Sequence, residues 1–147
     1  MKKIILLLPA LLLAACSGVI EYNQNLKKWQ DAEIKHYRYR LFVGCFCPFE
    51  NDMPLSIEVK DGKMVSMNYA DGTPVLPDDQ FYEIFEPYST LDRLFAQLGA
   101  ELTGNNDEVR VTYDPTYGFP DSIYIDRIKQ AADDELSLQI KNFEVLE

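Results

Sequence analysis

The stretch that decides the fold is Tyr37-Arg38-Tyr39-Arg40-Leu41-Phe42-Val43-Gly44-Cys45-Phe46-Cys47. Side chains along a β-strand point alternately to opposite faces. One face of this segment therefore carries Tyr37, Tyr39, Leu41, Val43, Cys45 and Cys47, and the other carries Arg38, Arg40, Phe42, Gly44 and Phe46. The pattern predicts a long strand with one face in the core, to which neighbouring strands pair.

The segments that follow predict a hairpin. Apolar residues alternate over 55–59 and again over 63–69, and Lys60-Asp61-Gly62 joins them. A three-residue turn would place Ile57 opposite Val65, whereas a two-residue turn would place Ile57 opposite Ser66. Pairing of apolar side chains favours the three-residue turn.

Two segments predict helices. Residues 23–35 are rich in helix formers, and Trp29, the only tryptophan, is expected to anchor this helix on the sheet. Residues 89–102 open with the capping-box pattern Ser89-Thr90-Leu91-Asp92 and continue with apolar residues at helical spacing. Residues 70–87 contain three prolines and an aromatic cluster, which predicts a long packed loop.

Further strands complete the expected sheet. Apolar and polar side chains alternate over 108–113, 122–126 and 136–145. A helix, a strand meander, a second helix and a second meander are typical of the α+β class with antiparallel pairing. We therefore expect a curved antiparallel sheet of about six strands with two helices packed on one face.

The N-terminus has the features of a secretory signal. Met1-Lys2-Lys3 precedes an apolar run over 4–13 that is too short to span a bilayer, and Leu13-Ala14-Ala15-Cys16 follows. These residues resemble the lipobox of bacterial lipoproteins, which implies cleavage after residue 15, lipidation of Cys16 and, with Ser17 next, an outer-membrane anchor. The expected organisation is a signal peptide over 1–15, a lipidated tether over 16–22 and one periplasm-facing domain over 23–147.

The chain is acidic. Its formal net charge of −10 becomes −12 when Lys2 and Lys3 leave with the signal peptide. Nucleic-acid binding relies on clustered Lys and Arg, so the composition argues against a nucleic-acid partner. An acidic surface favours basic partners or cations, although it also serves solubility alone.

Four segments carry a family resemblance. They are Tyr37 and Tyr39 leading to Cys45-Phe46-Cys47, residues 59–63, residues 90–95, and residues 113–120 (Tyr-Asp-Pro-Thr-Tyr-Gly-Phe-Pro) with Ile125-Asp126. The chain resembles a domain-of-unknown-function family of small bacterial secreted proteins and lipoproteins. The resemblance implies one extracytoplasmic domain over nearly all of the mature chain, and it implies no activity.

Cys45 and Cys47 have three interpretations. An oxidising periplasm pairs neighbouring thiols, which favours an intrachain disulfide. Alternate residues of an extended strand lie about 6.6 Å apart at Cα, near the upper limit for a bridge, but Gly44 and Pro48 permit a bend. The alternatives are a redox-active or metal-handling pair, which needs an activating positive charge or further ligands, and two reduced, buried thiols.

Two loops supply the other candidate sites. A turn-rich segment forms a candidate binding loop that contains Asp114, Tyr117, Gly118 and Pro120. Carboxylates suit calcium, and the candidate ligands are Asp126, Asp133, Asp134 and Glu135, although their spacing matches no EF-hand. We predict no cofactor and no catalytic residue, since His36 is the only histidine and no serine lies in a nucleophile motif.

Together these features predict a non-enzymatic envelope lipoprotein, a binding or accessory module held to the membrane through Cys16. A specific version is an inhibitor of a basic envelope-attacking enzyme such as lysozyme, because the domain is small and strongly acidic. The alternative is a thiol-redox or metal-handling protein that uses Cys45 and Cys47.

Overall fold

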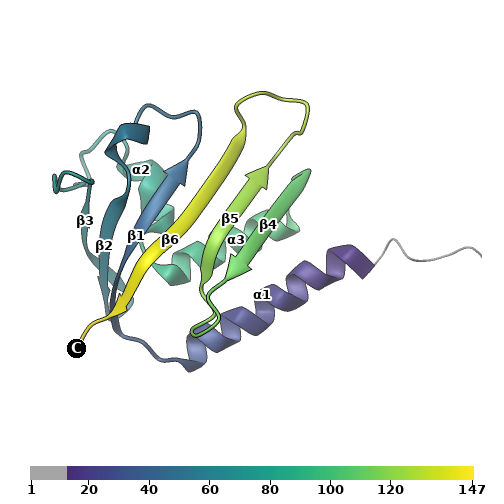
Figure 1. The fold of residues 1–147 in the computed structure, drawn as a ribbon, viewed down its shortest axis with the longest axis horizontal. Helices are drawn as coiled ribbons and strands as arrows, with labels where there is room; N and C mark the ends of the chain where they lie inside the picture. Colours follow the sequence, from purple (N-terminus) through teal and green to yellow (C-terminus); the bar gives the residue numbers. More distant parts are fainter. Residues whose placement is uncertain (1–12) are drawn as a thin grey trace, which may run out of the picture.

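A computed structural model describes the backbone of residues 13–147 and the side chains from Gly18 onward. Six strands form one antiparallel sheet in the order β3-β2-β1-β6-β5-β4 (Figure 1). The strands are β1 (His36–Gly44), β2 (Leu55–Lys60), β3 (Lys63–Asn68), β4 (Glu108–Tyr113), β5 (Pro120–Asp126) and β6 (Glu135–Val145). The predicted α+β class with a six-stranded antiparallel sheet is confirmed.

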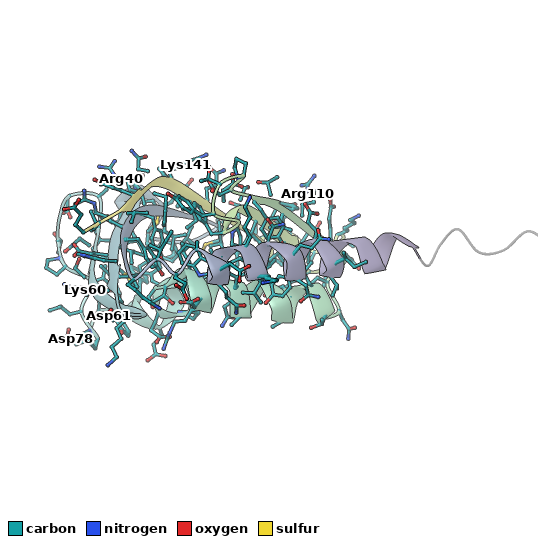
Figure 2. The ribbon with its side chains drawn as sticks, turned by 90° about the horizontal axis from the view of Figure 1, so that it is seen from below. Arg40, Lys60, Asp61, Asp78, Arg110 and Lys141 are labelled. Carbon is teal, nitrogen blue, oxygen red and sulfur yellow. A yellow bond between two sulfur atoms is a disulfide. The ribbon has the colours of Figure 1, made fainter. Side chains whose placement is uncertain are left out.

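The long helices α1 (Leu13–Asp31) and α3 (Leu91–Thr103) lie on the same side of the sheet (Figure 2). The Tyr22 hydroxyl on α1 donates a hydrogen bond of 3.0 Å to the backbone oxygen of Phe95 on α3. Short helices lie in two of the connections: η1 (Glu50–Asp52) between β1 and β2, and α2 (Tyr82–Phe85) with η2 (Glu86–Tyr88) between β3 and α3. No helix in the described part of the chain is long and apolar enough to cross a membrane.

The succession of one long helix and a three-stranded meander occurs twice along the chain. The first meander is β1 to β3 and the second is β4 to β6. Pairing of β1 with β6 joins the two meanders into one sheet, and this pairing makes β1 a central strand. The alternating segment identified from the sequence therefore lies at the middle of the fold.

One face of β1 forms part of the core. Tyr37, Tyr39 and Leu41 are at most 1% exposed, while Arg38 and Arg40 on the other face point to solvent. Both buried phenols have hydrogen-bond partners: Tyr37 Oη accepts from Leu91 N at 3.1 Å, and Tyr39 Oη donates to Tyr88 O at 2.7 Å. Because Tyr88 and Leu91 flank the start of α3, these bonds fix that helix against the sheet.

The first helix is longer than the sequence predicted. It already includes residues 16–22, which we expected to form a tether, and Tyr22 packs edge-on against Phe95 at 5.8 Å between ring centroids. Packing against α3 extends the helix beyond what local propensity predicts. Residues 1–12, which hold most of the predicted signal peptide, lie outside the described residues, and lipidation of Cys16 stays a prediction.

The turn between β2 and β3 corrects another prediction. Lys60 pairs with Lys63 across a two-residue turn in which Asp61 and Gly62 have φ of 50° and 72°. These angles suit an Asp-Gly type I′ turn, so the expected three-residue turn is wrong. A bulge after this turn restores apolar pairing by placing Met67 opposite Ile57.

Candidate functional site

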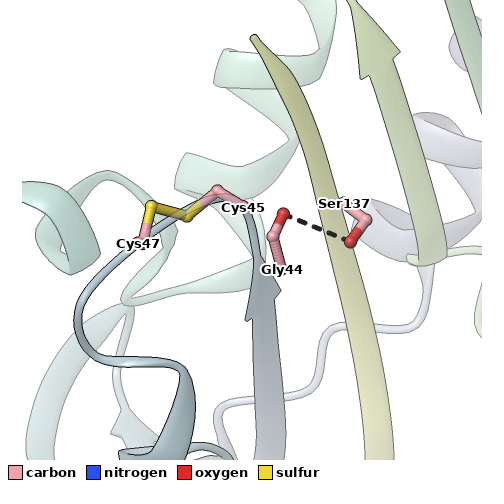
Figure 3. The surroundings of a disulfide bond; sticks show 4 residues. All are labelled: Gly44, Cys45, Cys47 and Ser137. Carbon is pink, nitrogen blue, oxygen red and sulfur yellow. Dashed lines mark hydrogen bonds between the residues drawn. A yellow bond between two sulfur atoms is a disulfide. The ribbon is translucent and has the colours of Figure 1, made fainter. Parts of the chain in front are cut away.

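The two cysteines form a disulfide just beyond the end of β1 (Figure 3). Cys47 N donates to Cys45 O at 2.8 Å, and this tight bend brings the Cα atoms to 5.2 Å from one another. The predicted strand thus ends at Gly44, and the expected bend is present. Phe46, which lies between the bonded cysteines, is 85% exposed.

Gly44 has a packing reason to be a glycine. A Cβ atom at this position would collide with Ser137 Oγ on β6, which donates a hydrogen bond to Gly44 O (Figure 3). The glycine therefore permits close approach of β1 and β6 at the point where the chain turns into the disulfide.

The candidate binding loop is packed against α1. Asp114 Oδ1 accepts from Thr116 N at 2.9 Å and from Tyr117 N at 2.6 Å, which shapes the loop. Gly118 has φ of 82°, and a Cβ atom there would lie 2.7 Å from Asn25 O on α1. Gly118, Phe119 and Pro120 are buried, so this part of the loop attaches α1 to the sheet, whereas Pro115 and Thr116 are exposed.

The candidate calcium ligands do not form a metal site. Asp114 lies between β4 and β5. At the other end of the sheet, Asp126 ends β5, Glu135 begins β6, and Asp133 and Asp134 lie in the loop between these strands (Figure 1). Among the described residues, no group of three or more His, Cys, Asp or Glu side chains is placed to hold a metal ion. Asp134 instead accepts a hydrogen bond of 2.8 Å from Ile128 N, which orders the loop.

Asp126 is the one buried acid in this group. It is 8% exposed, and its Oδ1 has no hydrogen-bond partner among the described residues. Burial, with smaller contributions from Asp134, Glu135 and Asp107, raises the pKa of the Asp126 carboxyl above its usual value. The ionised form of Asp126 is therefore disfavoured in the folded protein.

One cavity lies where α1 ends and the chain enters β1. Its volume is about 420 Å³, within the range of small-ligand sites. Trp29 and Tyr37 are among its lining residues, and their rings meet edge to face at 5.3 Å. We call this cavity the Trp29 pocket.

Acidic side chains surround the Trp29 pocket. Glu33 follows α1, Asp61 lies in the β2–β3 turn and Asp92 lies in the first turn of α3. Lys35 is the single basic residue of the lining. Asp92 Oδ1 accepts a hydrogen bond of 3.0 Å from Trp29 Nε1, which fixes the carboxylate against the indole edge. The three acidic residues come from separate elements and line the same cavity, so the pocket suits a cation.

Glu33 has an uncommon backbone conformation for a residue with a side chain, which it shares with Asp61, Asp133 and Asn142. Its φ is 49°, in the left-handed region, two residues after the end of α1 at Asp31, where glycine is usual. Glu33 N donates to Gln30 O at 3.2 Å, so the residue also closes the last turn of the helix. A non-glycine residue held in this conformation is strained, and such strain is concentrated at functional sites.

Sequence reasoning found only part of this site. Trp29 was correctly predicted to anchor the first helix, because it is 4% exposed and contacts Tyr37, Phe119 and Phe143. The three acids were missed, since they are far apart in the sequence and ordinary in composition. The available signal was the absence of a glycine after the helix, which ends at Asp31.

The model for a family of unknown function matches residues 21–145, which cover nearly the whole described domain. No curated protein and no solved structure matches the chain. The family match confirms the expected kind of family, and it assigns no activity. The chain belongs to the family of unknown function DUF6174.

Proposed function

We propose that this chain is a non-enzymatic envelope lipoprotein that binds a basic protein partner through the Trp29 pocket. In this proposal Cys16 anchors the protein to the outer membrane, and the domain faces the periplasm. The observation that carries the proposal is that Glu33, Asp61 and Asp92, from three separate elements, line one cavity together with Trp29 and Tyr37.

The pocket chemistry favours a lysine or arginine side chain as the bound group. A cation gains from the three carboxylates, and the partly exposed Ile34 in the lining offers apolar surface for the methylene stem. A net charge of −10 on the whole chain adds long-range attraction for a basic protein. An inhibitor of a basic envelope-attacking enzyme, such as lysozyme, fits this description.

The pocket itself is tested with a small probe. We expect N-acetyl-arginine amide, titrated into the full chain in detergent, to shift the NMR signals of Trp29 Nε1–H and of the Asp61 amide. Asp92→Asn keeps the oxygen that accepts from Trp29 but removes the charge, and it should weaken binding about tenfold. Asp78→Asn is the matched control, because Asp78 is exposed at the same end of the molecule (Figure 2) without lining the pocket.

The partner class is tested with lysozyme and with a periplasmic extract depleted of acidic proteins. We expect salt-sensitive binding that Asp92→Asn weakens more than Asp78→Asn does. Equal effects of the two substitutions would show that only net charge matters and would exclude the pocket as the binding site. Failure of the arginine probe and of every basic protein to bind would refute the proposed function.

A further inference from the structure

A second cleft lies on the opposite side of the sheet from the helices. Arg40 on β1 and Lys141 on β6 are direct cross-strand partners there. Figure 2 shows both side chains on the side of the sheet that faces away from α1 and α3. In a chain of net charge −10, two basic residues therefore face one another on the open surface.

Placing like charges directly opposite on neighbouring strands destabilises a sheet. The other arginines do not show this arrangement: Arg38 pairs with Glu144, Arg93 with Glu86, Arg110 with Glu108 and Arg127 with Glu101. Arg40 is the one arginine that forms no ion pair with a described residue. With 24 acidic residues in the chain, the missing partner calls for an explanation other than composition.

The cleft is built on a β-bulge. The register between β1 and β6 shifts between Arg38 and Arg40, and Asn142 takes up the shift with φ of 53°. A cavity of about 360 Å³ lies over this bulge. Arg40 and Asn142 line it together with Ser56, the partner of Arg40 on β2. Bulges of this kind redirect side chains, often beside binding sites. We call this cavity the Arg40 cleft.

Hydrogen-bond donors dominate the Arg40 cleft. Ser56, Arg40 and Asn142 come from three adjacent strands, so their donors approach from different directions. Glu144 also lines the cavity, but its carboxylate lies 2.6 Å from the Arg38 guanidinium and is thereby neutralised. Lys141 does not line the cavity, but it is the cross-strand partner of Arg40 and adds a second positive charge beside it on the same face (Figure 2).

We propose that the Arg40 cleft binds the phosphate group of a phosphorylated ligand. The positive charges of Arg40 and Lys141 match the charge of a phosphate monoester, which is about −1.5 to −2 at neutral pH. Donors that approach from several directions suit a tetrahedral oxyanion better than a planar carboxylate, which is best met by a single fork. The bound phosphate replaces the missing carboxylate partner and relieves the repulsion between Arg40 and Lys141.

The test is a titration of the full chain, in zwitterionic detergent at low ionic strength, with inorganic phosphate. We expect NMR shifts concentrated at the amides of Arg40, Lys141 and Asn142. Arg40→Gln should weaken binding about tenfold. The matched control is Arg110→Gln on the same face, where Arg110 pairs with Glu108 and lies 4.3 Å above the Tyr124 ring. Equal affinities of the two variants, or no saturable binding by the native chain, would overturn the proposal.

Two sources of the phosphate are separated by a second probe. Mixed micelles that contain phosphatidylglycerol are compared with purely zwitterionic micelles. Saturable binding of inorganic phosphate, of phosphatidylglycerol or of both supports the Arg40 cleft as the binding site if Arg40→Gln weakens that binding. Tighter binding of the lipid would identify a lipid headgroup as the ligand. Lys141→Glu gives an independent readout, because an ion pair between Arg40 and the introduced carboxylate would raise the melting temperature and abolish binding. A lower melting temperature with binding retained would contradict the proposal.

Discussion

Replacing Glu33 by glycine is expected to stabilise the protein and to weaken its binding of cations. Glu33 lies two residues after the end of α1 with φ of 49°, a conformation that brings a Cβ atom close to the following carbonyl oxygen. Glycine has no Cβ and adopts this conformation freely. The hydrogen bond from residue 33 N to Gln30 O, at 3.2 Å, involves only backbone and is kept.

The expected gain follows from two opposing terms. The left-handed conformation is unfavourable by about 1–2 kcal/mol for a residue with a side chain. Glycine also lowers the free energy of unfolding by about 0.4–1 kcal/mol, because it increases the conformational entropy of the unfolded chain. The net stabilisation is therefore about 0.5–1 kcal/mol, or roughly 2–4 °C in melting temperature for a domain of this size.

The same substitution removes one of the three carboxylates of the Trp29 pocket. Differential scanning calorimetry measures stability, and NMR titration with N-acetyl-arginine amide measures binding. Glu33→Gln is the matched control: it removes the charge but keeps the strain, so it should weaken binding without raising the melting temperature. Our reasoning fails if Glu33→Gly lowers the melting temperature, or if both variants bind the probe as the native chain does.

Other substitutions test the remaining structural conclusions. Gly118→Ala should destabilise the fold by at least about 2 kcal/mol in urea denaturation, because φ of 82° is strained for alanine and the new Cβ meets Asn25 O at 2.7 Å; a change near zero would show that the loop does not hold α1. Because the folded-state pKa of Asp126 is raised, the protonated carboxyl favours folding below its unfolded pKa of about 3.9, and this contribution disappears as pH rises through the folded-state pKa. Asp126→Asn should therefore raise the melting temperature increasingly from pH 4 to pH 7, and a difference independent of pH would refute this assignment. Replacing Cys45 and Cys47 together by serine should lower the free energy of unfolding by only about 1.6 kcal/mol, since the disulfide closes a loop of three residues, and it should leave binding of the arginine probe unchanged. Loss of probe binding in this variant would favour the thiol-based alternative.

The sequence predicted the central strand and both long helices because each has a strong local signal. Alternation over residues 37–43 identifies the buried face of β1, and the leucines of 91–102 identify α3. The start of α3 depends on Thr90, whose hydroxyl accepts a hydrogen bond from Arg93 N at 3.2 Å. Helix capping of this kind can be recognised in a sequence. The sequence did not predict the early start of α1, because this start depends on tertiary contacts between Tyr22 and Phe95.

Neither candidate site was predictable, since both depend on strand register. In the Trp29 pocket, Asp61 lies beside the end of α1 because its backbone N donates to Lys35 O at 2.7 Å. The hairpin register that carries Asp61 was mispredicted by one residue, because a bulge in β3 is invisible when only apolar pairing is considered. The cysteines gave the stronger sequence signal, yet they form a local disulfide at the edge of the structure.

The bulge at Asn142 links folding to the Arg40 cleft. Strict alternation from Ile140 would place residue 142 in the core and residue 143 in solvent, but the bulge inserts one residue and reverses this. Phe143 can then pack on Phe119 at 4.6 Å and on Trp29 at 6.1 Å, while Glu144 reaches Arg38. The three-residue step from Ile140 to Phe143 is the sequence signature of this bulge.

Aromatic packing accounts for the bulge itself, but it does not determine which residue stands at position 141, because Lys141 points to solvent on the other face. An acidic residue at that position would pair with Arg40 and stabilise the sheet, whereas lysine adds a second positive charge for the proposed phosphate ligand.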